Sequence, residues 1–208
     1  AQRLLKQRNS ALKCGTMSAS VRASFDPGLV QVAEQINCLR EAYLKLLEPM
    51  FFELLAGLVD LPDLKLGYYC GWTANRPYAE ILDETLERDL HLGYTQRGPQ
   101  RADVKLTLSG VNAAERLSRG HQKLVVVALR LAQGKLLSEV QGRNCVFLVD
   151  DLAAELDWAH RREICRQLAK LNTQVFVTSV GPNELTDCWP KGIQVNMFHV
   201  KHGQVSPS

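Results

Sequence analysis

Two adjacent carboxylates follow a continuous run of apolar residues in the second half of the chain. The run CVFLV at 145–149 is typical of a buried strand, and Asp150 and Asp151 come directly after it. Unpaired carboxylates are costly inside a sheet, so both acids are expected at the C-terminal end of this strand, where parallel sheets place ligands. One carboxylate there can hold Mg²⁺ beside phosphates and waters, and the other can polarise an attacking water. A strand that merely ends in two capping aspartates is the alternative.

A serine and a glycine precede a long apolar helix upstream of this strand. The segment LSRGHQK at 117–123 leads into LVVVALRLAQG. Free backbone N–H groups, the Ser118 hydroxyl and the positive end of the helix dipole can bind an anion such as a terminal phosphate. A plain helix N-cap at Ser118 is the alternative. The order of LSxG, long helix, apolar strand with two acids and then Glu155-Leu156-Asp157 favours the functional interpretation.

These segments resemble the motifs of ABC-type ATPases. LSRGHQK is similar to their signature motif, CVFLVDD to their Walker B strand and LAAELD to the D-loop that follows. The paired aspartates and the closing ELD resemble RecF, a bacterial DNA replication and repair family related to the structural-maintenance-of-chromosomes (SMC) ATPases. The segment 98–103 (GPQRAD) is similar to a GPHR-type loop of RecF. The resemblance covers essentially the whole chain and corresponds to the C-terminal part of a RecF.

The resemblance implies a role for each matching residue. Asp150 would help hold the Mg²⁺ of bound ATP, and Asp151 would be the general base or orient the attacking water. Ser118, Arg119 and Gly120 would close over the ATP of the opposite protomer, so the site would be complete only in a dimer. The remaining two implied positions are the D-loop residue at the dimer seam, Asp157, and the switch position after a later strand, Ser179.

The chain departs from the family pattern at several positions. His121 and Gln100 stand where the family usually has Gln and His, and Ala102 stands where an acid is common. No GxxxxGK[ST] sequence occurs, so the Walker A loop that cradles the β- and γ-phosphates is lacking. The chain alone is therefore expected to bind ATP poorly and not to hydrolyse it. Slow hydrolysis is expected only of a complete dimeric protein, which leaves open whether this chain is an enzyme.

The resemblance also implies partners and a location. They are single-stranded or gapped DNA and its duplex junctions, a second copy of the chain, the mediators RecR and RecO, and the recombinase RecA, in the cytoplasm. ATP and Mg²⁺ are the implied cofactors of the complete protein. Two other hypotheses stay open: a non-catalytic lobe that only binds protein or DNA, and a metal phosphohydrolase that uses Asp150 and Asp151 directly.

Hydrophobic patterns predict a helical first part and an α/β second part. Asp26-Pro27 is expected to cap a new helix after a Gly/Ser-rich break. Steps of three and four then define a heptad seam that predicts a hairpin arm with the helix at 1–13, with a simple helix packed on a core as the alternative. The seam consists of Leu29, Val32, Ile36, Leu39, Tyr43, Leu46 and Met50. Further helices are expected at 77–92, 118–138, 159–171 and near 182–187, and strands at 64–70, 103–108, 145–149, 174–179 and 194–200.

Together these elements predict an α/β fold. It is the C-terminal lobe of an ABC-type P-loop ATPase head, with a mostly parallel sheet covered on both faces, plus a helical, coiled-coil-like arm. The arm is assigned to residues 1–93 and the lobe of the ATPase head to residues 94–208.

Composition is that of a globular chain and gives little sign of its partners. Hydrophobic residues make up 46% and charged residues 23%, which argues against a disordered chain. A net charge of +3 is too small to indicate nucleic-acid binding by itself. Two basic groups are nevertheless candidates for DNA phosphates, with solvated helix faces as the alternative; they are Arg3, Lys6, Arg8 and Lys13, and Arg161 and Arg162.

Overall fold

The computed structural model describes residues 1–152, 156–181 and 185–207, and the chain divides into two compact units. Unit 1 comprises residues 1–49 and 61–117, and unit 2 comprises residues 50–60 and 118–208. One long helix continues from the first unit into the second. The functional division after residue 93 stays a prediction. Within the described ranges, no helix combines the length and the apolar character that crossing a membrane requires.

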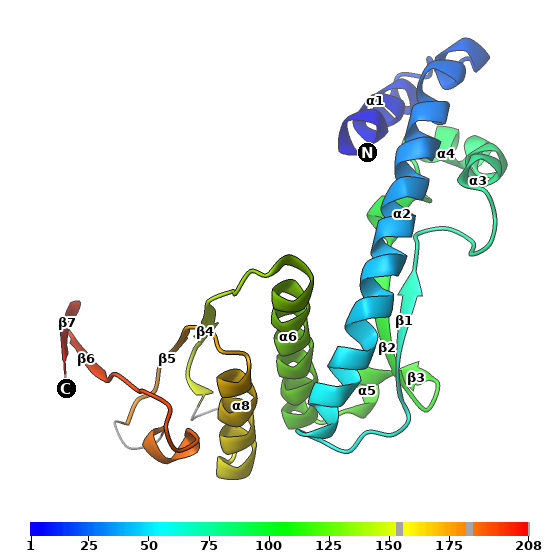
Figure 1. The fold of residues 1–208 in the computed structure, drawn as a ribbon. Coiled ribbons are helices and arrows are strands. Elements are labelled where there is room, and N and C mark those ends of the chain that lie inside the picture. The colour runs from blue at the N-terminus through cyan, green and yellow to red at the C-terminus, as the bar shows by residue number, and fades with distance from the viewer. Residues whose placement is uncertain (153–155, 182–184, 208) are drawn as a thin grey trace. The chain divides into compact units, whose positions relative to one another are not determined.

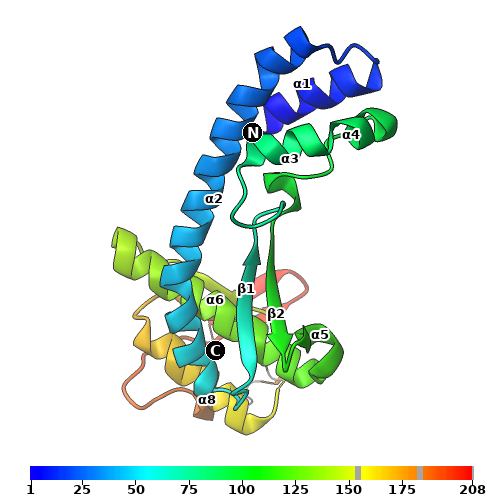
Figure 2. The ribbon, with the colours of Figure 1, turned by 90° about the vertical axis from the view of Figure 1, so that its right-hand side faces the viewer.

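Unit 1 is built on helices and a small antiparallel sheet (Figures 1 and 2). Its elements are α1 (Gln2–Lys13), α2 (Ala19–Ala56, shared with unit 2), β1 (Leu64–Tyr69), α3 (Tyr78–Glu84), α4 (Leu86–Leu92), η1 (Pro99–Arg101), β2 (Asp103–Leu108), β3 (Val111–Asn112) and α5 (Ala113–Arg116). The strand order is β1-β2-β3, and β1 pairs with β2 from Leu64↔Leu108 to Tyr69↔Asp103. The predicted strands at 64–70 and 103–108 are confirmed.

The first helix folds back against the early part of α2 (Figure 2). Leu4 and Leu5 of α1 pack on a core that includes Leu29 and Ala33 of α2. Further along the chain, the Trp72 and Tyr78 rings, 4.7 Å apart between centroids, complete this core. The predicted helix at 1–13 and its packing as a hairpin with the next helix are thus confirmed.

A buried arginine ties α1, α2 and α4 together. Arg8 is fully buried; its Nε donates to Asp26 Oδ1 at 3.0 Å and its Nη1 donates to Asp89 Oδ2 at 2.9 Å. The prediction that Asp26 caps a new helix is wrong, because α2 already begins at Ala19 and Asp26 lies inside it as a partner of Arg8. The proposed contact of Arg8 with DNA phosphates is also wrong, because its guanidinium is buried and does not reach the surface.

The buried face of α2 is offset from the predicted heptad seam. Leu29 is buried as predicted, but Leu39, Tyr43 and Leu46 are 70%, 43% and 51% exposed. Ala33 and Leu47 are buried in their place, and Arg40 Nη1 donates to Pro99 O at 2.8 Å from a position between them in sequence. The predicted seam is therefore only partly buried, because Val32, Ile36 and Met50 are half-buried and three of its seven residues are exposed.

Unit 2 contains a second long helix, which follows the signature-like segment, and the parallel strands that carry the other motifs. Its elements after the end of α2 are α6 (Arg119–Gln141), β4 (Phe147–Val149), α8 (Trp158–Lys170), β5 (Val175–Val177), η2 (Thr186–Cys188), β6 (Phe198–Lys201) and β7 (Gln204–Pro207). The end of α2 is held here by Lys135 Nζ, 2.7 Å from Glu53 Oε2, and by Gln167 Nε2, which donates to Leu54 O at 3.0 Å. The short helix expected near 182–187 falls partly outside the described residues.

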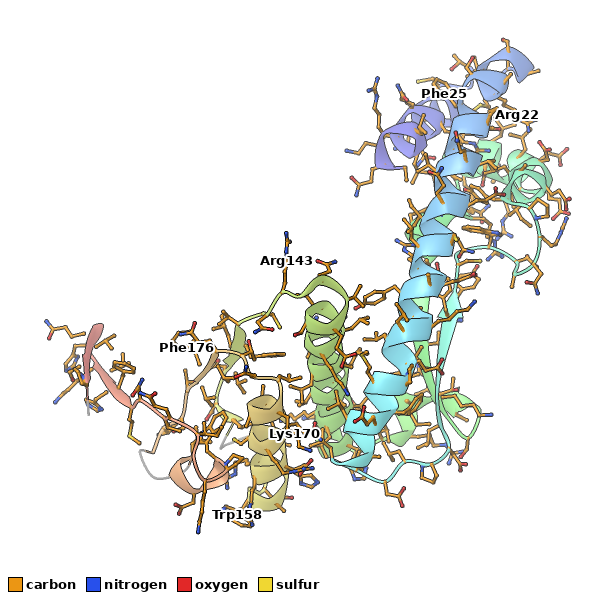
Figure 3. The ribbon with its side chains drawn as sticks, viewed as in Figure 1. Arg22, Phe25, Arg143, Trp158, Lys170 and Phe176 are labelled. Carbon is orange, nitrogen blue, oxygen red and sulfur yellow. The ribbon has the colours of Figure 1, made fainter. Side chains whose placement is uncertain are left out.

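The strands of unit 2 form two separate pairs. β4 and β5 are parallel with Phe147 opposite Val175, whereas β6 and β7 form an antiparallel hairpin. Phe147 faces α6 so closely that a Cβ at Gly134 would lie 2.5 Å from its Cζ. The expectation that both faces of this sheet are covered is wrong for the described chain, since Leu148 is 78% exposed and Phe176, labelled on β5 in Figure 3, is 52% exposed.

Candidate functional site

The two parallel strands bring the predicted acids and two hydroxyl side chains to one edge of the sheet. Val149 pairs with Val177, and the ladder ends where Thr178 N donates to Val149 O at 3.0 Å. Asp150 and Asp151 follow β4, and Thr178 and Ser179 follow β5. The expectation that both carboxylates lie at the C-terminal end of a parallel strand is confirmed. This is the edge at which α/β sheets bind ligands.

Thr178 organises both acids. Its Oγ1 donates to Asp150 Oδ1 at 2.6 Å and accepts from Asp151 N at 2.9 Å. Asp151 has φ 47°, in the left-handed region that few residue types besides glycine, asparagine and aspartate adopt readily. The turn that follows β4 is therefore fixed from β5, and the two neighbouring acids are held in different environments.

One oxygen of Asp151 is left without a partner. Its Oδ1 is buried and accepts no hydrogen bond from any residue that the structure describes, whereas Asp150 is exposed. A buried acceptor without a donor is unfavourable unless a water, an ion or a ligand completes it. An oxygen in this state beside a second carboxylate suits a positioned water or a hard cation.

The side chains at this edge fit Mg²⁺ only if waters and phosphate oxygens supply its other ligands. Within the described residues, no three His, Cys, Asp or Glu side chains gather as a preformed metal cage. Mg²⁺ is commonly held by one or two carboxylates while it keeps waters and phosphate oxygens as its other ligands. Asp150 and Asp151 match that pattern, with Asp150 the more accessible of the two.

The signature-like segment opens α6 from an exposed position. Ser118 is the N-cap, and its Oγ accepts from His121 N at 3.2 Å, so the plain capping interaction is present. Ser118, Arg119 and Gly120 are all exposed, and a Cβ at Gly120 would meet nothing closer than 3.9 Å. The first N–H groups of a helix have no intrahelical acceptor and remain available to an anion. No hydrogen bond or ion pair of the described residues joins this segment to Asp150 or Asp151.

The D-loop residue Asp157 caps another helix. It is the N-cap of α8, with Oδ1 accepting from His160 N at 3.0 Å and Oδ2 2.7 Å from His160 Nδ1. The backbone N–H of His160 and then its side chain hold the pKa of Asp157 below its ordinary value. Glu155 of the same motif lies outside the described residues. A charged Asp157 at an exposed helix start is compatible with a contact surface.

The switch position carries a local hydrogen bond. Ser179 is exposed and its Oγ donates to Gly181 O at 2.8 Å, so it does not contact the acids in this structure. Its neighbour Thr178 hydrogen-bonds to both acids and is not among the predicted site residues. Thr178 lies beside Asp150 because the parallel register of β4 and β5 continues past the Val149↔Val177 pair, and a local motif does not specify that register.

Replacing Thr178 with valine is expected to lower the free energy of unfolding of the chain by about 1 kcal/mol, because two hydrogen bonds are lost at an exposed edge. Thr178→Ser, which keeps the hydroxyl, is expected to stay closer to the parent. Urea unfolding of the three proteins measures this. Equal stability of the valine and serine variants would show that the hydroxyl does not hold the turn.

The loop at 98–103 keeps a defined shape despite its departures from the family pattern. Gln100 Nε2 donates to Thr95 O at 3.2 Å and Arg97 O at 3.3 Å, and Tyr78 Oη donates to Arg97 O at 2.7 Å. Gln100 thus serves as a donor to the loop backbone.

Comparisons with known proteins agree with these observations. A sequence profile described as "RecF/RecN/SMC N terminal domain" matches residues 10–205. A protein of Pseudomonas aeruginosa (strain LESB58) named DNA replication and repair protein RecF is 50% identical over 205 residues, which are 99% of this chain and 56% of that protein. A RecF of Stutzerimonas stutzeri is 48% identical over 99% of this chain and 55% of its own length. The chain thus spans a little over half the length of these relatives.

Solved structures share the fold. A structure of the recombination mediator protein RecF with ATP has a TM-score of 0.81 at 22% identity and covers 100% of this chain and 56% of its own. An SMC head bound to the C-terminal winged-helix domain of ScpA has a TM-score of 0.52 at 14% identity. The match covers 98% of this chain and 53% of the SMC head chain. The predicted α/β lobe of an ABC-type ATPase head and the resemblance to RecF are confirmed. The chain belongs to the RecF/RecN/SMC N terminal domain family.

Proposed function

We propose that the chain supplies the signature motif, the Walker B acids and the D-loop of a RecF-like, ATP-dependent DNA clamp. The observation that carries the proposal is the carboxyl edge of β4 and β5, where Thr178 holds Asp150 and leaves Asp151 Oδ1 unpartnered. The RecF relative with 50% sequence identity and the RecF structure with ATP support the choice of nucleotide. ATP brings both phosphate oxygens and a metal ion to such an edge.

The chain's own residues divide the work between two carboxylates. Asp150, exposed and fixed by Thr178, would hold the Mg²⁺ that neutralises charge on the phosphates. Asp151 would accept a hydrogen bond from the attacking water at its unpartnered Oδ1 and orient that water toward the terminal phosphorus. Thr178 keeps both acids in place from the neighbouring strand, so it acts as a positioning residue.

The signature segment would serve a second protomer. Ser118, Arg119 and Gly120 are exposed, and among the described residues no hydrogen bond or ion pair joins them to Asp150 or Asp151. An exposed helix N-terminus with a neighbouring guanidinium is suited to the terminal phosphate of a nucleotide bound elsewhere. Dimerisation on ATP follows if each protomer offers this segment to the nucleotide of its partner, with Asp157 at the seam.

The proposed setting is DNA repair in the cytoplasm. The complete clamp would bind single-stranded gaps or their duplex junctions, assist RecA loading with the mediators RecR and RecO, and leave DNA after slow hydrolysis. This chain has no Walker A sequence, so alone it is expected to bind ATP poorly and to act as a partner surface.

The test uses a chimera in which a Walker A-bearing N-terminal segment of a RecF relative precedes this chain, here called the RecF chimera. Ser118→Asp is expected to abolish its ATP-dependent dimerisation in sedimentation. Aspartate preserves the helix cap at least as well as serine but places a negative charge where the terminal phosphate must bind.

The matched control is Asn112→Asp, which makes the same kind of change at the cap of α5, where the Asn112 side chain accepts from Ala114 N at 3.1 Å. The control is expected to dimerise on ATP as the parent does. Dimerisation that survives Ser118→Asp, or a parent chimera that never dimerises on ATP, would contradict the proposed function.

A further inference from the structure

A cavity in unit 1 is lined by arginine and tyrosine side chains and includes none of the residues of the candidate nucleotide site. It has a volume of about 360 Å³ and is lined by Tyr69, Arg88, Tyr94, Gln96, Arg97 and Arg101. The lining comes from the end of β1, from α4, from the loop after α4 and from η1. It contains guanidinium groups and aromatic rings but no carboxylate, which makes it a concave site for an anion with a flat organic part.

Two of the arginines are available to a ligand. Arg88 and Arg101 are exposed and form no ion pair or hydrogen bond with any residue that the structure describes. Arg97 uses one donor, since its Nη1 donates to Tyr69 Oη at 2.9 Å. A planar guanidinium with free N–H groups matches the oxygen atoms of a phosphate in two-point contacts.

The charge around the cavity stays positive when its neighbours are included. Two acids lie next to the lining: Asp89 accepts from Gln96 N and is already paired with Arg8, and Asp103 is the strand partner of Tyr69. Lys105 offsets Asp103, because its Nζ lies 5.2 Å from the centroid of the Tyr69 ring. A cavity with this positive balance attracts a phosphate.

The loop that presents these side chains is fixed from beneath. Gln96 N donates to Asp89 Oδ1 at 3.0 Å, and Thr95 N donates to Asn9 Oδ1 at 2.9 Å. Gln96 Nε2, in contrast, is a buried nitrogen with no hydrogen-bond partner. A preorganised loop loses little entropy when a ligand binds.

The aromatic rings indicate what accompanies the phosphate. Tyr94 is 38% exposed and lines the same cavity as the free guanidinium groups. Exposed aromatic rings beside arginines are the usual platform for unpaired bases, whereas the bases of a duplex are stacked on one another and do not reach such a ring. A strand of unpaired nucleotides offers both a phosphate and a base to this cavity.

We propose that this cavity binds an unpaired nucleotide of single-stranded DNA, with the backbone phosphate on Arg88 and Arg101 and the base stacked on Tyr94. The proposal rests on the proposed function only in the choice of DNA as the polyanion. Its site lies wholly within unit 1 and uses none of the residues assigned to ATP.

The test measures binding of a labelled oligo(dT) strand to this chain without ATP. Arg88→Gln with Arg101→Gln is expected to weaken binding about tenfold or more at low salt and to reduce the salt slope by about 0.7, the contribution of the one single-strand phosphate that the two arginines share. The matched control is Arg116→Gln with Arg143→Gln, two exposed arginines outside the cavity (Arg143 is labelled in Figure 3). The control is expected to retain most of the affinity.

The stacking part is tested at Tyr94. Tyr94→Leu is expected to weaken oligo(dT) binding about tenfold, and Tyr94→Phe, which keeps the ring, is expected to bind like the parent. A loss in both variants would assign the effect to the hydroxyl and overturn the stacking. Circular dichroism of each variant confirms that the helices are intact.

Several outcomes would overturn the proposal. They are no binding of oligo(dT) by the parent chain at low salt, equal losses in the cavity and control variants, a blunt duplex hairpin bound as tightly as oligo(dT), and full competition by millimolar inorganic phosphate, which would indicate a site for phosphate alone. ATP-dependent dimerisation of the RecF chimera is a separate readout, so failure of the DNA site and failure of the proposed function are distinguishable.

Discussion

Arg8→Met is expected to lower the free energy of unfolding by about 3–5 kcal/mol, the usual cost of leaving a buried charge without its partner. Arg8 and Asp89 are both fully buried, 2.9 Å apart, and Arg8 also donates to Asp26 and to Thr95 Oγ1. Removal of the guanidinium leaves Asp89 charged in the interior. Urea unfolding followed by fluorescence measures the loss, because Trp72 is buried in the core of the same unit.

Two further variants separate the charge from the packing. Arg3→Met removes an exposed arginine from the same helix and is expected to change stability by less than about 0.5 kcal/mol. Arg8→Met combined with Asp89→Asn is expected to recover part of the loss, because the uncompensated charge is gone. If the double variant is much less stable than Arg8→Met alone, the unpaired charge is not the cause.

Asp151→Asn in the RecF chimera is expected to reduce ATP hydrolysis about 10²- to 10⁴-fold, the range that a positioned general base contributes. Asparagine has nearly the same shape and keeps one oxygen acceptor, so phosphate binding and ATP-dependent dimerisation are expected to remain. The ATP-bound dimer should therefore last longer than that of the parent. Hydrolysis and dimer lifetime are measured on the same samples.

The matched control for this change is Asp60→Asn, which neutralises an exposed acid elsewhere in unit 2. It is expected to hydrolyse ATP like the parent. An Asp151→Asn chimera that leaves the dimer or DNA faster than the parent would show that Asp151 has a different role, such as holding the nucleotide.

Local sequence predicted the motifs and most of the elements that carry them. The run CVFLVDD gave the strand and the position of its acids, because a continuous apolar run followed by charge has few structural solutions. Ser118 was recognisable as a helix start, and strand 103–108 matches β2 at both ends. These features depend on residues within a few positions of one another.

The errors arose where residues distant in sequence decide the structure. Asp26-Pro27 is a good local cap, but in the fold Asp26 accepts from Arg8, which lies 18 residues earlier, and the helix runs through it. Arg8 was assigned to the surface because its buried partner Asp89 is remote in sequence. Thr178 was missed because its importance depends on the register between β4 and β5. Pairing between distant segments is set by packing and is not encoded in a short motif.

The claim that the site is shared between two chains is tested most directly by mixing two inactive chimeras. One carries Ser118→Asp, and the other carries an alanine in place of the Walker A lysine of its N-terminal segment. A mixed dimer then has one site in which an intact Walker A loop faces an intact Ser118 segment. The mixture is expected to recover about a quarter of the parent ATPase activity, because half of the dimers are mixed and each has one of two symmetric sites intact. No recovery on mixing would contradict the shared site, because it would place the Ser118 segment on the nucleotide of its own chain.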